Sequence, residues 1–97
     1  MDSKFYWQLL EQERQPRFWL ALETENLLIG WDSVREIRAS GDFQNLQFSC
    51  EFGKVMFSAE FSLQELFENL QMEKIRRIDG TKLHCRVIVM DDNNNNV

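Results

Sequence analysis

The sequence has a single histidine, a single proline, four glycines and two cysteines among its 97 residues. So little proline and glycine, together with 43% apolar and 28% charged residues, excludes a disordered or fibrous chain and indicates a compact fold. A chain of this length has room for one domain with a modest core. We therefore expect a single domain over residues 1–90, followed by a disordered polar tail at 91–97 that includes four consecutive asparagines.

The residues that usually carry chemistry are also scarce. The two cysteines, Cys50 and Cys85, lack the CxxC spacing and the paired histidines of a zinc site. His84 and Cys85 are adjacent, and adjacent strand residues point to opposite faces, which disfavours a Cys-His nucleophile pair. The glycines are scattered singly, so no glycine-rich phosphate loop is present. We therefore expect no enzymatic activity, no bound metal and no cofactor.

Long hydrophobic runs are missing as well. No stretch approaches the ~20 apolar residues of a membrane-spanning helix. The first seven residues place an acid at position 2 and no basic region before an apolar run, which is not typical of a signal peptide. Two cysteines without an export signal are expected to be reduced thiols. These features predict a cytoplasmic protein that does not contact membranes.

The N-terminal half predicts a mixture of helix and strand. Asp2 or Ser3 can cap a helix that ends near Arg14, with Phe5 and Leu9 on its apolar side. Alternating apolar residues then predict strands at 17–23 and 27–31. Ser33 and Glu36 form a capping box for a short helix at 33–40, although a bent strand would satisfy the same residues. The sequence leaves these two readings of 33–40 open.

The segment from Leu46 to Phe61 has the clearest pattern, because apolar residues alternate on both sides of Gly53-Lys54. If this dipeptide is a type II′ turn, the numbers of opposite residues sum to 107, so that Phe48 faces Ala59. On one face of the hairpin, every pair of opposite residues is then apolar. We expect Leu46, Phe48, Cys50 and Phe52 on the buried face, against Val55, Phe57, Ala59 and Phe61.

The C-terminal part predicts a helix and a last strand. Ser62 and Glu65 form a second capping box, and the helix that follows presents Leu63, Leu66, Phe67 and Leu70 on one face. Asp79-Gly80 is either the stop of that helix or a hairpin turn. Residues 83–90 alternate as a strand. We expect an α+β fold with an antiparallel sheet of four to five strands and helices on one face, in the βαββαβ order of a ferredoxin-like unit with an added N-terminal helix.

Charge is uneven along the chain, whose net charge is −5. Five basic residues and one acid fall between Lys74 and Arg86, a local balance of +4. An acidic chain has little general affinity for phosphate backbones, but a basic segment can orient a partner. The alternative function is therefore binding of single-stranded nucleic acid through Arg76, Arg77, Lys82 and Arg86.

Aromatic residues are the remaining signal, since eight phenylalanines, three tryptophans and one tyrosine exceed the evident needs of so small a core. Exposed tryptophan and tyrosine commonly anchor protein interfaces. We therefore expect a non-catalytic adaptor, inhibitor or regulator that binds another protein, with a homodimer as one form of that interaction. The candidate contact residues are Tyr6, Trp7 and Trp19 as apolar anchors, with Glu51 and Glu60 as orienting charges.

Residues 53–61, GKVMFSAEF, distantly resemble the second signature of RNA-recognition motifs, which would imply bases stacked on an open sheet face. The expected register instead turns Phe57 and Phe61 toward the helix. It leaves Glu51, Met56 and Glu60 outside, where carboxylates would repel phosphate. Nucleic acid is therefore the less favoured partner.

Overall fold

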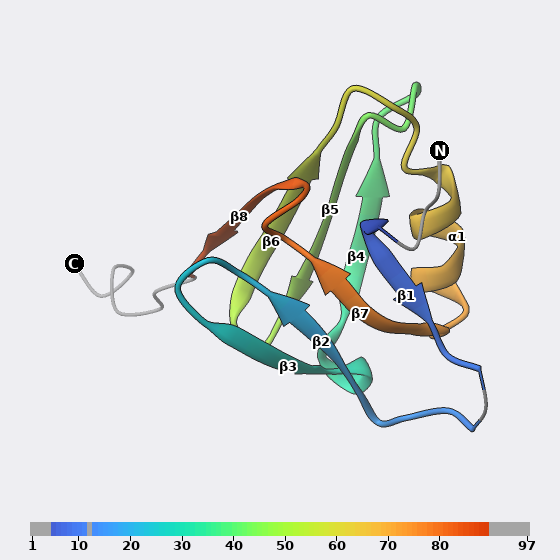
Figure 1. Cartoon of the computed structure of the whole chain (residues 1–97), viewed down its shortest axis with the longest axis vertical. Helices are drawn as coiled ribbons and strands as arrows, with labels where there is room; N and C mark the ends of the chain where they lie inside the picture. Colours follow the sequence, from blue (N-terminus) through green and yellow to red (C-terminus); the bar gives the residue numbers. More distant parts are fainter. Residues whose placement is uncertain (1–4, 12, 90–97) are drawn as a thin grey trace.

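The computed structural model describes residues 5–11 and 13–89, which form two four-stranded sheets and one α-helix (Figure 1). Sheet A contains, in spatial order, β1 (Trp7–Leu9), β7 (Ile75–Asp79), β2 (Arg17–Ala21) and β3 (Asn26–Gly30). Sheet B contains β4 (Arg35–Ala39), β5 (Asn45–Cys50), β6 (Gly53–Ser58) and β8 (His84–Ile88). The 3₁₀ turn η2 (Trp31–Ser33) leads from sheet A to sheet B, and α1 (Gln64–Gln71) leads back. The tail predicted at 91–97 lies outside the described residues.

The predicted α+β fold, with one antiparallel sheet covered by helices, is wrong. The strands divide between two sheets, and β2 pairs with β7 in parallel. Each sheet has one apolar face, and in this chain the two faces cover each other, which leaves α1 to contact β4 and β7 at one side (Figure 1). Alternation along a strand predicts which side is buried, but it does not predict what covers that side.

The helix predicted over 2–14 is also wrong. Residues 7–9 form the strand β1, which pairs antiparallel with β7. Trp7, which lay outside the expected apolar stripe, is only 3% exposed, whereas Phe5 inside that stripe is 55% exposed. Burial of the Trp7 side chain in the core therefore favours an extended conformation of this segment over a helix. Residues 1–4 and 12 of this predicted helix are not among the described residues.

Residues 33–40 follow the bent-strand reading rather than the helix. Residues 35–39 form β4, whose pairing with β5 is interrupted between Arg35 and Arg38. Glu36 lies at that bulge with a φ of 56°. The backbone hydrogen bonds that β5 offers to this segment outweigh the weak helical signal of one capping box.

The β5–β6 hairpin is present, but its predicted register is wrong. Leu46 pairs with Phe57 and Phe48 pairs with Val55, so that the turn consists of Glu51 and Phe52. Gly53 has a φ of 121°, and a Cβ on it would lie 2.2 Å from the Ile88 carbonyl oxygen. This glycine therefore permits close approach of β8 rather than forming the turn. The shift is an even number of residues, so the faces are conserved and all four paired apolar side chains are buried as predicted.

The core lies between the sheets and is closed by α1. The Phe18 ring of sheet A lies 6.0 Å from the Phe48 ring of sheet B, and 4.3 Å from the indole of Trp31. Leu63, Leu66 and Leu70 are buried as the helical spacing predicts. The helix ends at Gln71, and residues 80–83 are a turn that carries the chain from β7 in sheet A to β8 in sheet B. Each sheet therefore has one face packed against the core and one outer face on the opposite side.

Candidate functional site

A row of four outward side chains crosses sheet A. The pairing registers place Gln8, Arg77, Trp19 and Leu28 side by side on β1, β7, β2 and β3. Neighbouring strands lie about 4.8 Å apart, so adjacent side chains of this row are in reach of each other. Trp19 is 38% exposed and Leu28 is 58% exposed. With Asn26 and Asp79 from the next row, these residues are called the Trp19 face.

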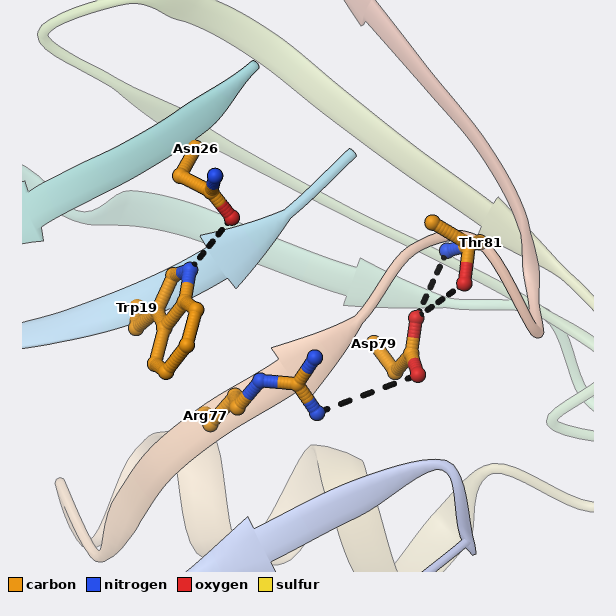
Figure 2. Close-up of polar contacts among 5 residues, drawn as sticks. All are labelled: Trp19, Asn26, Arg77, Asp79 and Thr81. Carbon is orange, nitrogen blue, oxygen red and sulfur yellow. Dashed lines mark hydrogen bonds and ion pairs between the residues drawn. The ribbon is translucent and has the colours of Figure 1, made fainter. Parts of the chain in front are cut away.

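The indole of Trp19 is held from two sides (Figure 2). Its Nε1 donates a hydrogen bond of 2.7 Å to Oδ1 of Asn26. The guanidinium carbon of Arg77 lies 4.6 Å from the ring centroid, which is cation–π geometry. Rotation of the indole would break both contacts, so this exposed aromatic side chain has a defined orientation.

Asp79 fixes the other end of Arg77. Its Oδ2 lies 3.8 Å from Nη1 of Arg77, and its Oδ1 accepts hydrogen bonds from the amide and the hydroxyl of Thr81 (Figure 2). Burial by itself raises the pKa of Asp79, but the Thr81 hydrogen bonds and the charges of Arg77 and Lys82 outweigh that effect and lower this pKa below its usual value. The carboxylate therefore anchors both the turn after β7 and the cation above Trp19.

An open depression of about 470 Å³ adjoins this face. Trp19 and Leu28 form its apolar side. Two cations and two carboxylates lie around it: Arg17, Arg76, Glu11 and Glu13. The depression can therefore accommodate an apolar side chain whose neighbours carry charge of either sign.

The predicted aromatic anchors do not share one surface. Trp7 lies in the core, and the half-buried Tyr6 packs on Phe61 with 4.7 Å between ring centroids. Of the three predicted aromatic anchors, only Trp19 lies on the outer face of sheet A. Leu28 was not among the predicted contact residues, because its outward position follows from the β2–β3 register and not from the apolar run in which it lies.

The two predicted orienting carboxylates lie apart from that face. Glu51 lies in the β5–β6 turn, where its Oε2 accepts a hydrogen bond of 3.0 Å from the amide of Gly30. This bond ties the turn of sheet B to the end of β3. Glu60 follows β6 and is exposed. Neither carboxylate lines the depression beside Trp19.

The four predicted nucleic-acid contacts are likewise divided between the sheets. Arg76 and Arg77 lie on β7 of sheet A, and Lys82 lies in the following turn with its Nζ 4.7 Å from the centroid of the Phe5 ring. Arg86 lies on β8 of sheet B. These four residues therefore do not form one continuous surface.

Groups with catalytic potential are dispersed in the described part of the chain. Within residues 5–11 and 13–89, no three histidine, cysteine, aspartate or glutamate side chains are grouped so as to hold a metal ion. His84 is exposed on β8, whereas Cys85 pairs with Phe57 on the inner side. Burial raises the pKa of Cys85 to about 12, and it also raises the pKa of Cys50. Both thiols are thus protonated at neutral pH.

Comparison with protein-family models, curated proteins and solved structures yields no match. Among the described residues, the single α-helix has eight residues and is too short to cross a membrane. The geometry of the two sheets is therefore the basis for proposing a function.

Proposed function

We propose that this chain is a non-catalytic protein-interaction module and that the Trp19 face is its contact surface. The observation that carries this proposal is the exposed indole of Trp19, held by Asn26 and Arg77 beside the more exposed Leu28. Tryptophan and arginine are the residues most enriched at the energetic centres of protein interfaces. A side chain that is already oriented loses little conformational entropy on binding.

The partner that fits this face presents an apolar side chain to the depression beside Trp19. Charged groups around that side chain would meet Arg17 and Arg76 on one part of the rim, and Glu11 and Glu13 on the other. Mixed charge around an apolar centre gives specificity and orientation. The partner is another protein, and a second copy of this chain is one such partner.

We also infer that the module acts in the cytoplasm and by binding alone. Support for the location comes from Cys50 and Cys85, which are free thiols. Support for the absence of catalysis comes from β8, where His84 and Cys85 lie on opposite faces and the raised pKa of Cys85 disfavours a nucleophilic thiolate.

The proposal is tested by site-specific photocrosslinking in a lysate of the source cells. A photoreactive phenylalanine analogue replaces Leu28 in one sample and Gln47, on the outer face of sheet B, in the other. We expect a defined protein adduct from position 28 that survives nuclease treatment and is absent at position 47. An adduct of two chains would identify a homodimer.

Variants then connect the adduct to the geometry. Trp19→Ala should reduce the affinity for the crosslinked protein roughly thirtyfold, as expected for a central interface tryptophan. Met72→Ala is the matched control, since it removes another exposed apolar side chain, which lies at the end of α1 and does not line the depression beside Trp19. Equal adducts at both positions, or undiminished binding by Trp19→Ala, would contradict the proposal.

A further inference from the structure

The outer face of sheet B has a different composition from the Trp19 face. One row across the sheet consists of Arg35, Ser49, Lys54 and Ile88, and the next consists of Arg38, Gln47, Met56 and Arg86. Asn45, Ser58 and His84 continue this pattern at one end. Rows lie about 7 Å apart along the strands, and the four strands together span about 14 Å.

This surface holds four cations: Arg35, Arg38, Lys54 and Arg86. These residues are called the basic face. The paired positions of this outer face contain no carboxylate, and Glu36 sits at the β4 bulge without a β5 partner. None of the four cations forms an ion pair with another residue of 5–11 or 13–89. They consequently remain available to an external anion.

The acidity of the whole chain does not cancel this local charge. The net charge is −5, but interactions between exposed charges are largely screened beyond a Debye length of about 10 Å in 0.1 M salt. A ligand on the basic face therefore experiences mainly its four cations, together with the nearby carboxylates of Glu36 at the β4 bulge and Glu51 in the β5–β6 turn, which leaves a local balance of +2. The sequence obscured this cluster, because Arg35 and Arg38 lie far from Arg86 along the chain.

The composition of this surface favours phosphates over an acidic protein. Its centre has neither tryptophan nor tyrosine, and Met56 is the central apolar side chain. Protein interfaces usually need an apolar anchor, whereas binding to a phosphate backbone is driven by release of counterions. Three of the four cations are arginines, whose planar guanidinium groups match phosphate oxygens. The neutral side chains between them, such as Gln47 and Ser49, are suitable partners for sugar and phosphate groups.

The shape of the surface favours a single strand. Duplex DNA is read by a helix or a narrow two-stranded ribbon that enters a groove. β5 and β6 each pair with a neighbouring strand on both edges, so they cannot enter a groove of duplex DNA. A sheet face is a common platform for single strands. An open depression of about 340 Å³, lined by Met56, His84 and Arg86 among others, offers space for a base beside the cations.

We propose that the basic face of sheet B binds single-stranded nucleic acid, chiefly through its phosphates and with little sequence preference. This function is separate from the proposed protein interaction, because the two surfaces lie on different sheets. Four phosphate contacts predict that log K falls with log salt concentration with a slope of about −3, and that affinity decreases about 50-fold between roughly 50 and 200 mM salt.

The test is fluorescence anisotropy of the whole chain with labelled oligo(dT) and oligo(U) of about 16 nucleotides, the upper range for such sites. The double variant Arg38→Gln/Arg86→Gln should bind roughly tenfold more weakly or worse in low salt, with about half the salt slope. Arg76→Gln/Lys82→Gln is the matched control, since it removes the same charge from sheet A and the turn after it. We expect the control to bind like the unmodified chain.

Three further binding measurements complete the test of the proposal. A duplex of the same length and a poly-glutamate peptide should each bind at least about tenfold more weakly than the oligonucleotide, since neither offers a flexible line of phosphates. Trp19→Ala should bind the oligonucleotide normally. Absent binding, equal losses in both double variants, or equal binding of the duplex or of poly-glutamate would each overturn the proposal. Circular dichroism of every variant establishes that it is folded.

Discussion

The Trp19 face and the basic face are both formed by four paired strands, but they differ in whether their arginines have partners within the molecule. On sheet A, Arg77 is stacked on Trp19 and lies beside Asp79. On sheet B, Arg86 has Met56 as its cross-strand neighbour and forms no ion pair within the described residues. Arg77 and Arg86 are separated by only nine positions in the sequence. The neighbours across the strands, and not the local sequence, decide whether an arginine is neutralised or available.

The two arginines differ in the ligands they can attract, because the guanidinium of Arg77 already has partners and that of Arg86 is solvated. A guanidinium that already shares its charge with a carboxylate and a ring is less strongly attracted to an external anion, and its planar surface adds to an apolar contact area. An unpaired guanidinium keeps its full charge and its counterions, which a phosphate can displace. This difference is why we propose a protein partner for the Trp19 face and a nucleic acid for the basic face.

The largest expected effect separates the inward and outward tryptophans of sheet A. Trp7→Ala should lower the free energy of unfolding by about 3–5 kcal/mol, because it empties part of the core. Trp19→Ala should lower it by only about 1 kcal/mol, the value of a partly exposed cation–π contact. Urea denaturation measures both. Similar losses would mean that Trp19 is a structural side chain, which would weaken the distinction between core and contact surface.

The next effect concerns the backbone beneath the basic face. Gly53→Ala should destabilise the protein by about 3 kcal/mol, because the new Cβ would overlap the Ile88 carbonyl at a φ that alanine avoids. Gly41→Ala is the control, since no atom outside the glycine and its two chain neighbours lies within 4 Å of the added Cβ. Thermal and urea denaturation compare the two variants. Equal stability would indicate that β8 does not need this close approach to pair with β6.

A smaller effect tests the carboxylate that supports Arg77. Because the pKa of Asp79 is lowered from 3.8, its charged form stabilises the fold; this contribution is fully present above pH 4 or so and is lost as the pH falls through the lower pKa of the folded state. Asp79→Asn should therefore cost about 1 kcal/mol at neutral pH, and the difference should shrink below about pH 4. Urea denaturation at several pH values measures this trend. A difference independent of pH would contradict the role of the charge.

The smallest effect is expected on the basic face. Arg38→Gln/Arg86→Gln should change the free energy of unfolding by less than about 0.5 kcal/mol, since exposed cations without partners contribute little to stability. Arg77→Gln should cost about 1 kcal/mol, because that side chain stacks on Trp19 and lies beside Asp79. Chemical denaturation in the same buffer compares them. A larger loss from the double variant would show that its arginines are structural.

The parts of the fold that could be predicted are those with strong local patterns. The helix after Ser62 and the buried residues of β5 and β6 follow from apolar spacing, since periods of 3.6 and 2 each place one set of side chains on one side. The hairpin register was missed because a glycine beside a strand has two uses, a turn or a close contact with another strand. Only the position of Ile88 distinguishes them.

The candidate surfaces were less accessible to prediction. Trp19 was identified from its residue type, but Leu28 and Arg77 join it through registers with β3 and β7. Glu51 is predicted as an orienting charge; in the structure it accepts a hydrogen bond from Gly30 and does not line the depression beside Trp19. Of the cations on the basic face, only Arg86 was among the predicted nucleic-acid contacts. Arg35, Arg38 and Lys54 lie on other strands and join it through the registers of sheet B.

By itself, the sequence of this protein determined the inward and outward sides of its clearest strands and the position of α1. The physical reason is that the direction of successive Cβ atoms is a local property of strands and helices. The tertiary structure alone decided which strands share a sheet, that two sheets cover each other, and which cations lie together. These outcomes depend on the free energy of burying all apolar faces at once, and strands far apart in the sequence contribute to it equally.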